Sequence, residues 1–144
     1  MKIFTIGFTK KNAEEFFSKL RQPGLVRLID ARLNNVSQLA GFTKRDDLKY
    51  FVRVINGIDY QHLPVLAPSQ EILDAYKKNG GSWSTYEHQF FSLLKERRIE
   101  EKVSKTLMDG ACLLCSESTP ENCHRRLVAE YLRRHWEELE IMHL

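Results

Sequence analysis

The part of the sequence best suited to chemistry is the run Cys123-His124-Arg125. Thr119 and Pro120 precede it, and Thr as N-cap with Pro at the first helical position is typical of a helix start. We therefore expect Cys123 in the first turn of a helix, where free N–H groups and the helix dipole favour negative charge. A thiol in that position has a lowered pKa and is a candidate nucleophile. The same helix start, with His124 and Arg125, would hold a phosphate or carboxylate.

Two further cysteines precede this run, and a small buried thiol is the ordinary alternative role for all three. Cys112 lies in the middle of an apolar stretch, so we expect it in the core. Cys115 points to the opposite face, next to a strand end, and is a second candidate for the reaction. The spacing of Cys112 and Cys115 is that of a redox dithiol, but such motifs lie at helix starts and this pair lies within a predicted strand.

Zinc is a further alternative that the sequence does not favour. The potential ligands are Cys115, Cys123, His124 and His62. Structural zinc sites usually present two close pairs of ligands, and these residues do not. Cys123 and His124 are neighbours that would not share one face of the predicted helix. We therefore predict neither a metal site nor another bound cofactor.

Polar side chains also follow the other predicted strands. The candidate acid–base groups are Asp30, His62 and Glu117. The candidate substrate-binding or anion-binding groups are Thr9, Arg32, Tyr60, His124 and Arg125. Asp30 and Arg32 have an alternative role as an ion pair that closes a strand end. His62 has an alternative role as a hydrogen-bonded histidine of the sheet.

These residues require a fold that gathers strand ends at one edge. Apolar and β-branched runs predict strands at 2–7, 25–31, 58–63, 111–116 and 139–144. Helical patterns lie between them, at 13–20, 44–56, 68–107 and from 120 onwards. Strands that alternate with helical crossovers form a mostly parallel sheet. We therefore expect an α/β fold, a Rossmann-like three-layer arrangement of about five strands flanked by helices, with its site beyond the carboxyl ends of the strands.

Individual residues predict where the helices begin and end. Asn12 is the expected N-cap of the first helix. A loop at 32–43 leads to the second helix, which Thr43 is expected to cap and Gly57 to end. Gly80-Gly81 breaks the long helical segment. Three aromatic residues at helical spacing after this break are expected in the core rather than as a stacking platform: Trp83, Tyr86 and Phe90.

The composition is that of an ordinary globular protein. Of the 144 residues, 42% are hydrophobic and 28% charged, which excludes a disordered, collagen-like or coiled-coil chain. The length predicts one domain over 1–144. Apolar runs fall far short of the roughly 20 residues that cross a bilayer, and the N-terminus reads as a strand rather than a secretory signal. We therefore expect a cytoplasmic protein without a membrane partner.

The net charge limits the kinds of binding partner, and the cysteine count bears on disulfide bonding. A net charge of +3 permits an anionic small molecule or a nucleic acid, but it lacks the strong basic stripe of a dedicated nucleic-acid binder. Three cysteines are an odd number, which argues against a disulfide scaffold. Nothing in the sequence predicts an oligomeric state.

The motifs at the strand ends are similar to those of a known family. They are the segments 5–9, 30–32, 57–64, 113–117 and 120–125. On these motifs the chain resembles the domain of unknown function 488 family, small α/β proteins without an agreed activity. The resemblance implies a single site formed by Asp30, Arg32, His62, Cys115, Glu117, Cys123, His124 and Arg125.

Three functions are consistent with these residues. The first is an enzyme that acts on a phosphate-bearing or nucleotide-like substrate, with Cys123 as nucleophile. A cysteine-phosphatase loop is not favoured, because neither Cys115 nor Cys123 is followed six residues later by Arg. The second is a nucleic-acid or nucleotide-binding module without chemistry, in which Arg125 holds the anion. The third is a thiol redox sensor that uses Cys115 and Cys123.

Overall fold

The structure is a computed structural model that describes residues 1–36 and 41–144. Within these ranges, five strands form one parallel sheet in the order β3-β2-β4-β1-β5. The strands are β1 (Lys2–Gly7), β2 (Arg27–Asp30), β3 (Asp59–His62), β4 (Ala111–Cys115) and β5 (Glu140–His143). The predicted α/β fold with a parallel sheet of about five strands is confirmed.

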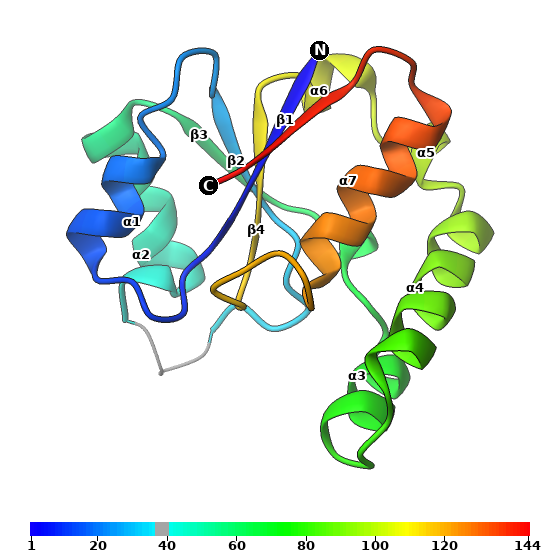
Figure 1. Ribbon diagram of the computed structural model, residues 1–144. Helices are drawn as coiled ribbons and strands as arrows, with labels where there is room; N and C mark the ends of the chain where they lie inside the picture. Colours follow the sequence, from blue (N-terminus) through cyan, green and yellow to red (C-terminus); the bar gives the residue numbers. More distant parts are fainter. Residues whose placement is uncertain (37–40) are drawn as a thin grey trace.

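Helices cover both faces of the sheet, which makes three layers (Figure 1). On one face lie α1 (Ala13–Lys19) and α2 (Arg45–Phe51). On the other lie α3 (Gln70–Lys77), α4 (Trp83–Arg97), α5 (Ile99–Lys102), α6 (Lys105–Met108) and α7 (His124–His135). Three short helical turns are η1 (Gly41–Thr43), η2 (Val52–Asn56) and η3 (Pro64–Leu66).

Alternation along the strands divides the core into two parts. In β1, Phe4 packs with Phe16 of α1, whereas its neighbour Ile3 packs with Phe90 of α4. Successive side chains of a strand point to opposite faces, and both faces of this sheet are covered, so the central strands are mostly apolar and β4 is apolar throughout. Cys112 lies on the α1 and α2 side, fully buried and with a free thiol, as predicted.

Several predicted helix ends are confirmed. Asn12 is the N-cap of α1, and its Oδ1 accepts a hydrogen bond from the Glu15 N–H at 2.8 Å. Gly57 ends η2 in the left-handed conformation, with φ of 66°, which glycine adopts without a Cβ clash. The break at Gly80-Gly81 separates α3 from α4.

Two helix predictions are wrong. Thr43 does not cap α2, which begins after Lys44; Thr43 is buried in η1, and its carbonyl accepts a hydrogen bond from Arg32 Nη2 at 2.6 Å. Residues 37–40 of the predicted loop lie outside the described residues. The second part of the 68–107 segment is not one helix, because Arg98 takes a left-handed conformation (φ 52°) and Ser104 caps a separate α6.

The register brings the carboxyl ends of the central strands to one edge. Gly7 of β1 lies beside Cys115 of β4, and Asp30 of β2 lies beside Leu114 of β4 and His62 of β3. Four adjacent strand ends therefore meet where ligands of parallel α/β proteins bind. Across the described part of the chain, no helix combines the length and apolar character needed to cross a membrane.

Candidate functional site

A pocket of about 160 Å³ lies at this edge of the sheet. It is lined by the ends of β2 and β4, the start of α7, and residues of α3 and α4. The predicted site residues that line it are Arg32, Cys115, Glu117, Cys123 and His124. The other predicted site residues, which stand outside its lining, are Thr9, Asp30, Tyr60, His62 and Arg125.

The start of α7 differs from the prediction. The helix begins at His124 rather than Pro120, and Cys123 is the N-cap residue in extended conformation (φ −135°, ψ 140°). Thr119 is therefore not the cap. The Pro120 carbonyl is used in a turn instead, where it accepts hydrogen bonds from the Cys123 N–H and from Arg126 Nε, each at 3.3 Å. Because Cys123 precedes the helix, the argument that Cys123 and His124 cannot share a helix face no longer applies.

Cys115 and Cys123 meet at the pocket. Their Sγ atoms are in bonding contact as a disulfide, and their Cα atoms are 7.2 Å apart. Both residues are buried, with 0% and 3% of their surface exposed. One comes from the end of β4 and the other from the cap of α7, so the fold brings the two sulfurs together and leaves Cys112 in the core.

Arg125 lies beneath these cysteines and is fully buried. Its Nη1 donates to Cys115 Sγ at 3.4 Å and to the Glu117 carbonyl at 2.6 Å, and its Nε donates to Thr5 Oγ1 at 3.3 Å. Its Nη2 has no hydrogen-bond partner within the described ranges, which also offer Arg125 no carboxylate ion pair. Burial lowers the pKa of the guanidinium to about 10. Within the described ranges the cation therefore has no ion-pair partner, and the carboxylates of Glu117 and Glu121 act on it only at longer range.

Gly7 explains how the guanidinium reaches this position. A Cβ on residue 7 would lie 1.5 Å from the Glu117 carbonyl oxygen and 2.6 Å from Arg125 Nη1. Only glycine allows the loop after β4 to cross the end of β1 so closely. Gly7 at the end of β1 is thus a packing requirement of the site.

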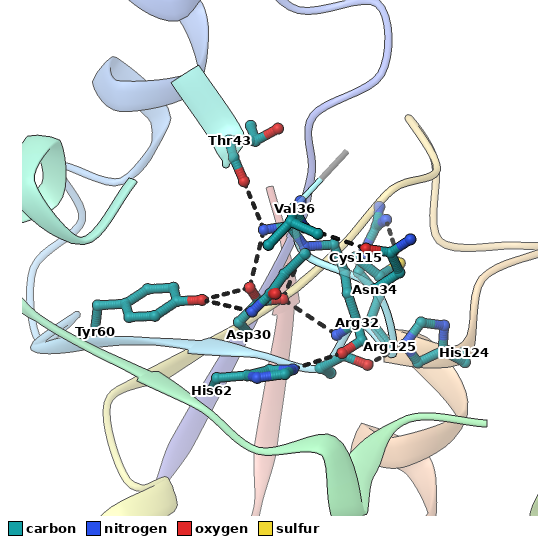
Figure 2. A network of polar contacts seen from close by, with 12 residues as sticks. Asp30, Arg32, Asn34, Val36, Thr43, Tyr60, His62, Cys115, His124 and Arg125 are labelled. Atoms are coloured by element: carbon teal, nitrogen blue, oxygen red, sulfur yellow. Dashed lines mark hydrogen bonds and ion pairs between the residues drawn. The ribbon is translucent and has the colours of Figure 1, made fainter. Parts of the chain in front are cut away.

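Asp30 and Arg32 form a closed ion pair at the end of β2 (Figure 2). Arg32 Nε donates to Asp30 Oδ1 at 2.8 Å and Nη2 donates to Oδ2 at 2.9 Å. Burial alone would raise the pKa of the Asp30 carboxyl, but the hydrogen bonds and charge of Arg32, with a further hydrogen bond from Tyr60, hold it below its ordinary value. This geometry matches the alternative role of an ion pair that closes the strand end, because both side chains are buried and their charges and hydrogen bonds compensate each other.

The remaining residues outside the pocket support this pair. The Tyr60 hydroxyl donates to Asp30 Oδ2 at 2.6 Å, and His62 Nε2 bonds to the Arg32 carbonyl at 2.8 Å. Figure 2 shows Tyr60 and His62 reaching the end of β2 from β3. The Thr9 side chain is exposed, and its N–H donates to the Ser116 carbonyl at 3.0 Å. These residues hold the loops that surround the pocket.

His124 links the two groups of residues. Its Nε2 bonds to the Ala31 carbonyl at 2.7 Å, so that nitrogen carries the proton and Nδ1 is left as an acceptor. Its ring packs edge-on to Phe90. Removal from water lowers the pKa of His124 to about 4, and the charge of Arg125 acts in the same direction. The ring is therefore neutral at pH 7.

The walls of the pocket include residues that we did not predict for the site. Trp83 and Tyr86 stack with ring centroids 4.7 Å apart, and both line the pocket. Lys77 also lines it, with Nζ 3.6 Å from a carboxylate oxygen of Glu117. The helical spacing of the two aromatic residues was visible in the sequence, but it predicts a buried stripe and does not show which edge borders a pocket.

Fold and site together define an α/β protein with a parallel sheet and a cysteine-lined pocket at its carboxyl edge. A family model described as Domain of unknown function DUF488 matches residues 12–132. The chain belongs to this family, which confirms the resemblance seen in the motifs. No curated protein and no solved structure matches the chain.

Proposed function

We propose that this protein is an enzyme that acts on a small, planar, anionic molecule such as a nucleotide, through a thiolate centre at Cys115. The observation that carries the proposal is the buried Arg125, which has no carboxylate partner among the described residues and donates to Cys115 Sγ at 3.4 Å. A cation beside a thiol favours the thiolate and lowers the thiol pKa. In the reduced protein the Cys115 thiolate would then be the negative charge that compensates Arg125.

The pocket supports a ligand of limited size. Its volume of about 160 Å³ is below the roughly 300–1,000 Å³ of pockets that enclose a drug-sized molecule. It therefore suits one ring or one anionic group, while the rest of a nucleotide lies over the rim. The stacked Trp83 and Tyr86 favour a planar group. Lys77 also lines the pocket, and a bound anion would compete with Glu117 for its ammonium group.

The chemistry would divide between two kinds of residue. The Cys115 thiolate would form a bond to an electrophilic atom of the bound molecule while the bond from that atom to its leaving group breaks, and the leaving group would take the electron pair and a proton from water. A second water, which loses its proton to a neighbouring base, would then release the product and restore the thiolate. His124 is neutral at pH 7 and offers Nδ1 as an acceptor, and Glu117 lines the same pocket. We favour Cys115 over Cys123 as the nucleophile because Arg125 donates a hydrogen bond to the Cys115 sulfur.

The test is the rate of alkylation of each cysteine against pH, on reduced protein in the presence of a metal chelator. We expect Cys115 to titrate well below the free value of about 8.5, and Arg125→Met to lower its rate at pH 7 by about tenfold. A panel of nucleotides and inorganic phosphate should include one class that protects Cys115. Cys112 serves as the internal control, because burial raises the pKa of that thiol.

Two results would contradict this proposal. A Cys115 pKa at or above the free value would remove the thiolate centre. Failure of every anion in the panel to protect Cys115 would remove the substrate class. Binding of single-stranded RNA or DNA with a steep salt dependence, without protection by small nucleotides, would favour the nucleic-acid-binding alternative instead.

A second candidate function, a reversible thiol redox sensor, is supported by the contact between the Cys115 and Cys123 sulfurs. One hydrogen peroxide would convert two thiols to one disulfide and two waters. Mass spectrometry after mild peroxide treatment should show loss of two hydrogen atoms and a peptide linking the two residues. An unchanged mass would remove this candidate.

A further inference from the structure

We infer that Cys115, Cys123 and His124 bind one zinc ion when the two thiols are reduced. The sulfur atoms and one ring nitrogen of His124 lie within 4.8 Å of one another, and no other group of His, Cys, Asp or Glu residues in the described part of the chain does the same. Two thiolates and one imidazole are ligands that zinc prefers. The inference deepens the proposed function: it rests on the thiolate centre, though not on the substrate.

The backbone spacing of the two cysteines suits a metal bridge. Their Cα atoms are 7.2 Å apart, which is beyond the range of about 4.4–6.8 Å usual for disulfides. Two sulfurs bound to one tetrahedral zinc at about 2.3 Å each lie roughly 3.8 Å apart. The Cα atoms of a zinc-bridged pair are therefore farther apart than those of a disulfide.

The hydrogen bonds around the three residues are those of a metal site. The His124 Nε2–H donates to the Ala31 carbonyl at 2.7 Å, which orients the ring and leaves Nδ1 as the ligand atom. Zinc-binding histidines almost always donate their other ring N–H to a carbonyl or carboxylate. Arg125 Nη1 donates to Cys115 Sγ at 3.4 Å and stabilises the thiolate form. Both outer partners are in place before any metal binds.

Charge balance favours the metal. Two buried thiolates side by side repel each other, and a single Arg125 offsets only one of them. A divalent cation neutralises the pair and leaves the charge of Arg125 as the net charge of the site. Three protein ligands leave one position for water or substrate, which is typical of catalytic rather than structural zinc. All three ligands line the pocket, so this position would face it.

Reduction of the disulfide must precede metal binding. A reductant, such as a dithiol or a phosphine, supplies two electrons and, with two protons from water, converts the disulfide to two thiols. The ion then replaces the two thiol protons, which are released to solvent. The disulfide and the zinc complex are alternative states of the same two sulfurs.

The experiment uses the full chain. The protein is reduced with a phosphine under nitrogen and treated with a chelator, and both reagents are removed before metal is added. We expect it to bind one Co²⁺ per chain, with a sulfur-to-cobalt absorption band in the near ultraviolet that Zn²⁺ removes. Each ion bound should release up to two protons. Cys115→Ser, Cys123→Ser and His124→Asn should each weaken binding by more than about tenfold, whereas Cys112→Ala should keep wild-type affinity and stoichiometry.

Circular dichroism and a thiol count on each variant confirm that it is folded and reduced. If folded, reduced wild-type protein binds neither Co²⁺ nor Zn²⁺ at micromolar concentration, the inference is wrong. Wild-type affinity in folded His124→Asn would also overturn it, because the site would lack its third ligand. The alkylation test of the proposed function runs in chelator, so the thiolate centre can be confirmed while the zinc site fails.

Discussion

Two buried arginines at the same edge of the sheet have opposite surroundings. Arg32 meets both oxygens of the Asp30 carboxylate, so its charge is compensated within the protein. Arg125 meets a hydroxyl, a sulfur and a carbonyl, and the described residues give it no carboxylate. The first arrangement is complete without a ligand. The second gains from a thiolate or a bound anion, because a buried charge without a partner is costly.

This difference separates residues that bond to one another from those that we propose to react. Asp30, Arg32, Tyr60 and His62 bond to one another or to the backbone and hold loops in place. Cys115 and Cys123 face the pocket, next to a cation that has no other negative partner among the described residues. The sequence offered both groups as candidates for one site. The geometry supports our proposal of reactivity only for the group around Cys115, Cys123 and Arg125.

The largest expected effect comes from removing each arginine in turn. Arg32→Met leaves the Asp30 carboxylate buried and unpaired, and should lower the free energy of unfolding by about 3–5 kcal/mol. In the disulfide form, where Cys115 carries no charge, Arg125→Met leaves no buried charge unpaired; it removes a donor from the Glu117 carbonyl and should cost about 1–3 kcal/mol. Urea denaturation of both variants measures the contrast. Adding Asp30→Asn to Arg32→Met should restore part of the loss, and equal losses for the two single variants would refute the comparison.

A smaller effect is expected from filling the space at the end of β1. In Gly7→Ala, the new methyl would overlap the Glu117 carbonyl and press on Arg125. Overpacking of this kind costs about 1–3 kcal/mol, and it should also slow alkylation of Cys115. Gly41→Ala is the matched control, since a Cβ at that position has no atom of the described residues within 4 Å, and its free energy of unfolding should stay within about 0.5 kcal/mol of wild type. If Gly7→Ala behaves like the control, the close crossing is not required.

The smallest expected effect is a difference between Asp30 and Arg125 in how the unfolding free energy depends on pH. The pKa of Asp30 is lowered in the folded state, so its ionised form adds stability above the unfolded value of about 3.9 and loses it as the pH falls below that value. The difference in unfolding free energy between wild type and Asp30→Asn should therefore shrink from pH 6 to pH 3. Arg125→Met should keep the wild-type pH dependence in this range. A constant difference for Asp30→Asn would show that its ionisation does not stabilise the fold.

Local patterns in the sequence predicted most of the architecture. The alternation of apolar runs and helical stripes predicted the five strands and the parallel sheet, because burial on both faces favours apolar runs in the central strands, above all in β4. Asn12 and Gly57 were predictable because a cap and a left-handed turn each depend on a single residue type. Thr119 and Pro120 misled, because the Pro120 carbonyl bonds to Arg126 in a turn instead of starting the helix.

By itself the sequence determined the fold class, the family and the chemical types available at the strand ends. Only the tertiary structure decided which of those residues complete each other. Asp30 stands two residues before Arg32 and was already a candidate ion-pair partner in the sequence. The partners of Arg125 come from β1, the end of β4 and the loop after it, so only the fold shows that those among the described residues include no carboxylate. The same holds for Cys115 and Cys123, which meet because the register of β4 and the start of α7 bring their sulfurs to one pocket.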